Sequence, residues 1–302
     1  MSLFRKDNSA GTAEKQELWS KDDEKYFFKR YSQPGSDRPD YLTDQANSLY
    51  VQNVLKDDKI TDSVIRILET YDSDFPNDKI FKATAYYLRG LICRERGDTD
   101  RMFEFFKKAA DAEIVYPERL AGGGLDYAEH IVKYGRTELY GEAKKYAGLY
   151  KIDDPDTPLL TYRISMILLA IAESDRDTER QGHYKKRAEA ALNTVAGIDK
   201  KLRCVKMIKV KDLNEKVEDR IRLFMLRNGF GIGMHNGIVL LQKKHSSCFH
   251  NVIVEPVFDT IFVIAFVLSY MGETGLDGFV SIAAKRPLKK IIDDFERTFT
   301  DM

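Results

Sequence analysis

From about residue 42 onward, hydrophobic positions recur with helical spacing. Between residues 83 and 93, small and apolar side chains fall on one face of a helix: Ala83, Tyr86, Tyr87, Gly90 and Cys93. Gly97-Asp98 then interrupts the pattern. A second apolar face follows, formed by Met102, Phe106, Ala109 and Ala110. The two segments are therefore predicted to pack as an antiparallel pair of helices.

The same interruption recurs along the chain. Polar turn signals lie roughly 40 residues apart, a spacing in the range of helical repeats, at Asp57-Asp58, Gly97-Asp98, Gly135-Arg136 and 175–177. Thr157-Pro158 predicts a helix start, and Thr178 with Gln181 predicts a capping box. Gly122 to Gly124 weaken the third pair, because glycine costs backbone entropy. The pattern predicts a mainly α fold, an α-solenoid of about four helical hairpins over residues 42–199.

The two ends of the chain differ from this central domain. Residues 1–41 are predicted to be a polar, partly disordered lead-in, because 32–40 contains helix-breaking residues. Residues 200–302 are predicted to form a small C-terminal α+β module. Its strands could also be a hairpin that caps the last repeat, since an open helical stack must cover its apolar end.

Within the module, an amphipathic helix is predicted over 214–227, with Gly229 as its stop and a hairpin turn at 235–237. The apolar run over 261–271 is predicted to be a buried helix opened by Pro256. A short strand is predicted over 279–284. An amphipathic helix with Leu288, Ile291, Ile292 and Phe295 on its apolar face is predicted to close the chain.

Residues 83–112 resemble a tetratricopeptide or Sel1-like repeat. Gly90 is the small residue of the first helix, "GD" at 97–98 forms the turn, and "FFKKAADA" from 105 is similar to the end of the second helix. The resemblance implies stacked hairpins with a concave face that binds a protein or peptide. It also implies that Tyr87, Leu91 and Arg94 face this groove. Alternatively, Tyr87 and Leu91 are core residues between repeats.

Charge adds one local candidate. The chain has 48 basic and 48 acidic residues, so no global field attracts nucleic acid or membrane. Residues 200–211 nevertheless carry six basic side chains and no acid. Nucleic acid or phosphate could bind there through Lys200, Lys201, Arg203 and Lys206. The alternative is a solvated helix face. The glycines at 229–237 follow a helix rather than a strand, which argues against a nucleotide-binding loop.

Histidine and cysteine offer a second candidate. His235, His245, Cys248 and His250 are possible ligands of zinc or another divalent metal. Along a single strand His245 and Cys248 would point to opposite faces, so a loop is expected to be needed to gather them. With Glu255, this cluster could serve a metal-dependent hydrolase or nuclease-like effector. Cys248 paired with a histidine could instead be a nucleophile, and exposed loop histidines beside a partly buried cysteine are the simpler alternative.

Compartment and partners complete the prediction. The three cysteines are far apart and odd in number, which argues against a disulfide framework and favours the cytoplasm. The N-terminus lacks the apolar region of a secretory signal. The run over 261–271 is too short to span a bilayer, so no membrane partner is expected. Because no set of residues demands catalysis, we expect a cytoplasmic scaffold or adaptor that binds a protein or peptide. The sequence indicates no oligomeric state.

Overall fold

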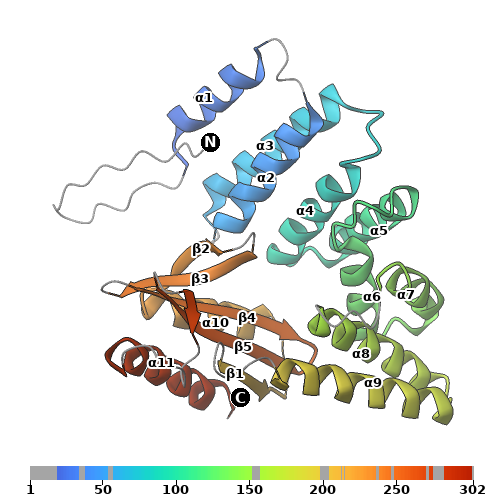
Figure 1. The fold of residues 1–302 in the computed structure, drawn as a ribbon. Coiled ribbons are helices and arrows are strands. Elements are labelled where there is room, and N and C mark those ends of the chain that lie inside the picture. Colours follow the sequence, from blue (N-terminus) through green and yellow to red (C-terminus); the bar gives the residue numbers. More distant parts are fainter. Residues whose placement is uncertain are drawn as a thin grey trace. The chain divides into compact units, whose positions relative to one another are not determined.

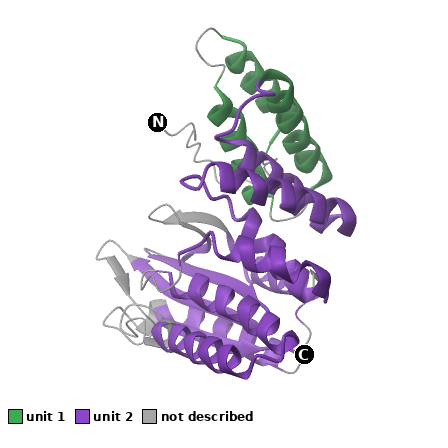
Figure 2. Ribbon diagram, turned by 90° about the vertical axis from the view of Figure 1, so that its right-hand side faces the viewer, with its two compact units in different colours: residues 1–74 green, residues 75–302 purple. Residues whose placement is uncertain are grey.

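The computed structural model describes a mainly helical protein with an antiparallel sheet near its C-terminus (Figure 1). The described residues are 19–33, 38–53, 57–151, 157–197, 204–211, 213, 215–235, 238–245, 248–269, 272–274 and 282–300. They divide into two compact units, residues 1–74 and 75–302 (Figure 2). This division follows how compactly the residues are packed and does not test the domains predicted from the sequence. Those domains, 1–41, 42–199 and 200–302, stay a prediction.

The first unit contains three helices, α1 (Lys21–Tyr31), α2 (Pro39–Gln52) and α3 (Asp58–Asp74). A capping box between Ser20 and Asp23 starts α1. The buried ring of Phe27 stacks on Tyr41 of α2 with centroids 5.0 Å apart. Residues 21–31 of the lead-in therefore form a packed helix, while residues 1–18 lie outside the described part of the chain.

The helices of the second unit follow in antiparallel order, and each packs against the next: α4 (Lys82–Glu95), α5 (Thr99–Val115), α6 (Gly123–Lys133), η1 (Thr137–Leu139) leading into α7 (Tyr140–Ala147), α8 (Pro158–Ser174) and α9 (Thr178–Gly197). The predicted breaks at Gly97-Asp98, Gly135-Arg136 and 175–177 fall between these elements, and the break at Asp57-Asp58 falls at the start of α3. Gly90 of α4 permits the closest approach, because a Cβ there would lie 2.3 Å from Cδ1 of Phe106. The small residue expected at position 90 is thus required by packing.

Three of the connections share one turn. After α4, the Asp98 N–H donates to Cys93 O and the Gly97 N–H to Arg94 O. The same two bonds close α6 and α8, with Ile131 and Ala172 in the place of Cys93. This is a Schellman turn, whose left-handed residue is Gly97, Gly135 or Arg176, with φ of 70°, 62° and 56°. The shared turn makes Cys93, Ile131 and Ala172 equivalent positions.

The capping box predicted on Thr178 is wrong by one residue. Asp177 is the cap of α9, because its Oδ1 accepts a hydrogen bond from the Arg180 N–H at 3.0 Å. Gln181 does not return to the cap, and its side-chain amide donates to Ala172 O. The predicted start of α8 is confirmed, with Pro158 in the first turn.

The C-terminal elements are β1 (Cys204–Lys209), α10 (Glu215–Arg227), β2 (Gly231–His235), β3 (Ile238–His245), β4 (Cys248–Val257), β5 (Thr260–Ser269), β6 (Gly272–Thr274) and α11 (Ile282–Thr300). All described strand pairs are antiparallel, in the order β1-β5-β4-β3-β2, with β6 also paired to β5. The helix predicted over 214–227 is confirmed as α10. Gly229, with φ of 80°, ends it as expected.

The buried helix predicted over 261–271 is wrong for 261–269, which belong to β5 (Thr260–Ser269), and residues 270–271 lie outside the described part of the chain. Helices α10 and α11 cover one face of β5, and α8 and α9 cover the other. Its sequence is therefore continuously apolar and lacks the alternation of a half-exposed strand. Pro256 lies within β4, opposite Ile261, and does not open a helix. The strand predicted over 279–284 is also wrong for Ile282 to Ala284, which begin α11. Residues 279–281 lie outside the described residues.

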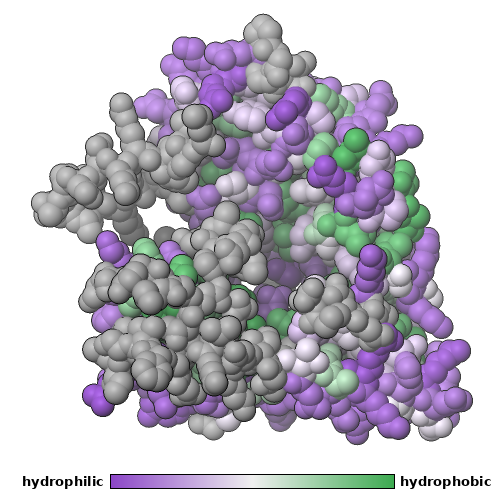
Figure 3. Space-filling model, viewed as in Figure 1, coloured by the Kyte–Doolittle hydropathy of each residue, from purple (hydrophilic) through white to green (hydrophobic). Residues whose placement is uncertain are grey.

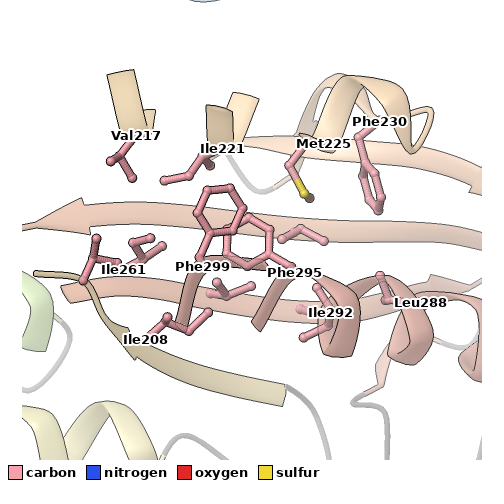
Figure 4. Packing of buried hydrophobic residues seen from close by; sticks show 14 of the residues in the cluster. Ile208, Val217, Ile221, Met225, Phe230, Ile261, Leu288, Ile292, Phe295 and Phe299 are labelled. Atoms are coloured by element: carbon pink, nitrogen blue, oxygen red, sulfur yellow. The ribbon is translucent and has the colours of Figure 1, made fainter. Parts of the chain in front are cut away.

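Two apolar clusters cover the two faces of the sheet. On one face, side chains of α10 and α11 converge over the strands (Figure 4), including Ile221, Met225, Ile292, Phe295 and Phe299. On the other face, Tyr162 of α8 meets Phe262 of β5 edge to face, with centroids 5.4 Å apart. The helical array and the sheet therefore share a core. None of the described helices has the length and apolar character needed to cross a bilayer.

Candidate functional site: an ionic network facing the sheet

The residues expected in a groove on α4 have different surroundings. Leu91 is buried. The ring of Tyr87 lies 5.8 Å from that of Phe106, and a Cβ on Gly122 would touch it. Both fit the alternative in which they are core residues. Arg94 differs, because its charge acts on Asp126 and His130 of α6.

Arg163 of α8 is the centre of a network that the sequence did not predict. Its Nη2 lies 2.5 Å from Oδ1 of Asp126, and its Nε pairs with the Glu129 carboxylate. The Asp126 side chain is 4% exposed, Glu129 13% and Arg163 21%. One guanidinium thus binds two carboxylates of the neighbouring helix in a largely desolvated place.

Burial and charge oppose each other in this network. Burial disfavours ionised Asp126, but the charges of Arg163, Arg94 and His130 outweigh it and hold the pKa of this carboxyl below its ordinary value. Burial lowers the pKa of His130, against the attraction of Asp126. The His130 Nδ1 lies 2.7 Å from the Asp126 carbonyl oxygen, and because that oxygen can only accept, the ring donates its Nδ1–H there.

Asp126 occupies a core position of its helix. The shared turn also makes the positions five residues before Cys93, Ile131 and Ala172 equivalent. These positions hold Leu88, Asp126 and Ile167, and all three are buried. The hairpins before and after therefore place an aliphatic side chain where this one places a carboxylate. This substitution is the signal in the sequence that could have located the network.

Glu255 of β4 faces the same network from the sheet. It pairs with Phe262, and side chains of directly opposed residues share a face. Phe262 packs against Tyr162, the neighbour of Arg163 in the chain. The Glu255 side chain is exposed, yet burial raises its pKa, against the attraction of Arg163 and with the repulsion of Asp126 and Glu129. The Glu255 carboxylate is therefore accessible to water and close enough to the charged side chains of α6 and α8 to be influenced by them.

A second buried carboxylate, Glu113 at the end of α5, is bound almost entirely by main chain. Its Oε1 accepts the N–H groups of Ala121, Gly122 and Gly123 at 2.8, 2.8 and 2.9 Å. Its Oε2 accepts the Gly124 N–H at 2.8 Å and the Tyr150 hydroxyl at 2.9 Å. The glycines predicted to weaken this hairpin therefore form the start of α6 around an internal anion.

His245, Cys248 and His250 come together without a loop. A hairpin places His245 directly opposite Cys248, and His250 lies on the same face two residues later. The two imidazole rings stack with centroids 4.8 Å apart. The expectation that a strand would separate these residues is wrong, because it considered one strand and not a pair.

Although these three side chains are close together, their surroundings do not favour a nucleophile or a metal site. The Cys248 thiol is buried and donates to His245 O at 3.1 Å, and burial raises its pKa, which disfavours a nucleophilic thiolate. The side chain of His235 lies outside the described side chains. Among the residues that the structure describes, no three His, Cys, Asp or Glu side chains are placed to hold a metal ion together.

The basic segment at 200–211 is partly engaged within the protein. Residues 204–209 form β1, so the alternative of a solvated helix face is wrong there. Lys206 Nζ lies 2.7 Å from Oε2 of Glu296, and this hydrogen bond raises the pKa of Lys206. Lys209 pairs with Asp259. Lys200, Lys201 and Arg203 lie outside the described residues.

The visible surface is mostly hydrophilic, and hydrophobic residues gather on the right of Figure 3, over α5. Exposed apolar side chains at the end of α5 and in the following loop are Ile114, Val115 and Leu120.

Comparison with known proteins adds no functional assignment to this geometry. No family model, curated protein or solved structure matches the chain.

Proposed function

We propose that this protein is a cytoplasmic helical-repeat scaffold, an α-solenoid of about four hairpins similar to tetratricopeptide arrays, that binds a segment of a partner protein. The binding face is formed by the first helices of successive hairpins, α4, α6 and α8. The C-terminal module acts as a cap or a second binding surface. The free state of Cys93, Cys204 and Cys248 is compatible with a reducing compartment.

The network centred on Arg163 carries this proposal. It joins charged side chains from three successive first helices: Arg94 on α4, Asp126 and Glu129 on α6, and Arg163 on α8. Buried ion pairs seldom stabilise a fold more than apolar residues of similar size would. A buried carboxylate at a core position is therefore better explained by recognition than by stability, and perturbed titratable groups gather at functional sites.

Site-specific photo-cross-linking in the native cell tests the binding face. A photoreactive phenylalanine at Ala170, the position equivalent to Glu129, is expected to capture a partner protein. The same residue at Glu104, an exposed position on α5, serves as the control and should capture none. Capture from position 104 alone, or from neither position, contradicts the proposal.

A metal-dependent activity is the second candidate, favoured by the convergence of His245, Cys248 and His250 on one hairpin face. A metal there would require these side chains to reorient. Elemental analysis of the untagged protein should then find about one zinc or manganese ion per chain. The metal should be lost when His245 and His250 are replaced by alanine. Protein purified without metal, or a variant that retains it, argues against this candidate.

A further inference from the structure

We propose that Glu255 binds a basic side chain, lysine or arginine, of the partner segment. The receptor is the charged group formed by Glu255 of β4 together with Asp126 and Glu129 of α6 and Arg163 of α8. This inference rests on the proposed function, because it specifies which chemical group of the partner enters the binding face.

The position of Glu255 on its strand directs it toward the helices. Val257, two residues later on the same face, is buried in the cluster that contains Tyr162 and Phe262. Glu255 is opposite Phe262, so it lies beside this cluster, next to the helix that carries Arg163. The influence of Arg163, Asp126 and Glu129 on its carboxyl agrees with this placement.

The charges of this group do not balance. Arg163 is committed to Asp126 and Glu129 by hydrogen bonds. Arg94 acts on Asp126, the more buried of the two acids. Glu255 has no hydrogen-bond or ion-pair partner among the residues that the structure describes. Among Asp126, Glu129, Glu255, Arg94 and Arg163, three carboxylates thus accompany two guanidinium groups, and Glu218 adds further negative charge near Glu255. One monovalent cation at Glu255 would reduce this excess.

The geometry favours an organic cation over a metal ion. Oxygen atoms of Asp126 and Glu129 already accept hydrogen bonds from Arg163, so Glu255 is the available carboxylate. A divalent metal ion in a protein needs several ligands. An ammonium or guanidinium group needs only one carboxylate and a partly desolvated setting. The crowding that raises the pKa of Glu255 would also strengthen its attraction to such a group.

Selection from a random peptide display library tests the charge of the ligand directly. The full-length wild-type protein should enrich peptides with lysine or arginine at one fixed position. Glu255→Gln should weaken binding of the best selected peptide by about tenfold, the effect of losing one charge-assisted hydrogen bond. Glu255→Lys should reverse the selection toward aspartate or glutamate at that position. Glu104→Lys, a charge reversal on an exposed side chain of α5, is the matched control and should select the same peptides as wild type.

The outcomes separate this inference from the proposed function. If peptides are enriched but show no basic position, or bind Glu255→Lys as well as wild type, the role of Glu255 is refuted while peptide binding stands. If no peptide is enriched by any of these proteins, both are refuted. A variant that unfolds at the same temperature as wild type is folded, so a change in its peptide preference is not caused by unfolding. If Glu255→Lys unfolds early, the role of Glu255 is judged from Glu255→Gln, whose size matches glutamate.

Discussion

At the scale of single residues, Glu113 is a buried carboxylate whose charge must be compensated by the groups around it. Its carboxylate is fully buried, and no lysine or arginine of the described chain forms an ion pair with it. Four main-chain N–H groups and the Tyr150 hydroxyl supply the compensation, helped by the positive end of α6. The N–H groups of this loop stabilise the buried carboxylate, and the carboxylate in turn holds the loop in its conformation.

Replacing Glu113 with glutamine should reduce the free energy of unfolding by about 2–4 kcal/mol, because a neutral amide accepts weakly and brings donors of its own toward N–H groups. Urea denaturation measures the change. Glu118→Gln, an exposed glutamate in the following loop, should change stability by less than about 0.5 kcal/mol. Equal effects of the two substitutions would show that the buried carboxylate is not a structural anion.

Arg163 should be more costly to remove alone than together with its partner. Arg163→Met leaves two crowded carboxylates without their cation and should cost about 3–5 kcal/mol. Adding Asp126→Leu, which restores the aliphatic residue found at positions 88 and 167, should recover a large part of that loss. Chemical denaturation of the two single variants and the double variant measures the coupling. Strictly additive losses would contradict the network.

His130 should make the protein less stable in mild acid. Burial lowers its pKa in the folded state, so the unfolded chain takes up the proton first as the pH falls below about 6.5. Its contribution to stability is therefore present above that pH and decreases below it, by at most about 1.4 kcal/mol per pH unit. The stability of His130→Gln should vary less between pH 7 and pH 5 than that of wild type. His183→Gln, at an exposed histidine, should keep the wild-type profile.

At the scale of elements, the shared Schellman turn sets where each first helix ends. Two of the three turns use glycine at the left-handed residue, and the third uses Arg176 with φ of 56°. A side chain in this conformation costs free energy that glycine avoids. The third turn thus contains strain that the first two lack.

The turns should respond in opposite directions to exchange of the left-handed residue. Gly97→Ala should reduce the free energy of unfolding by about 1 kcal/mol. A Cβ at position 97 would meet no other atom within 4 Å, so this cost is conformational and not steric crowding by neighbours. Arg176→Gly should raise the free energy of unfolding by a few tenths to about 1 kcal/mol. Thermal or urea unfolding checks both, and a destabilised Arg176→Gly would mean that its side chain contributes contacts that outweigh the strain.

At the scale of the whole molecule, the sequence predicts some parts of the structure and not others. Helices and their breaks follow from local signals, such as the spacing from Ala83 to Cys93 and the Gly97-Asp98 turn. The run that forms β5 resembles a helix because a strand covered on both faces shows no alternation. The sequence does not reveal the network, because Asp126 and Arg163 are distant in sequence and look like ordinary polar positions. Pairing of strands, which places His245 opposite Cys248, is likewise invisible within one segment.

The contact between Gly90 and Phe106 has a consequence for comparison with other proteins. The ring of Phe106 is completely enclosed, so it has nowhere to go when a carbon atom is added at position 90. Functional chains that diverged from this one should therefore retain glycine there even where surrounding letters have changed. Gly90 would then serve as a reference position for aligning distantly related sequences.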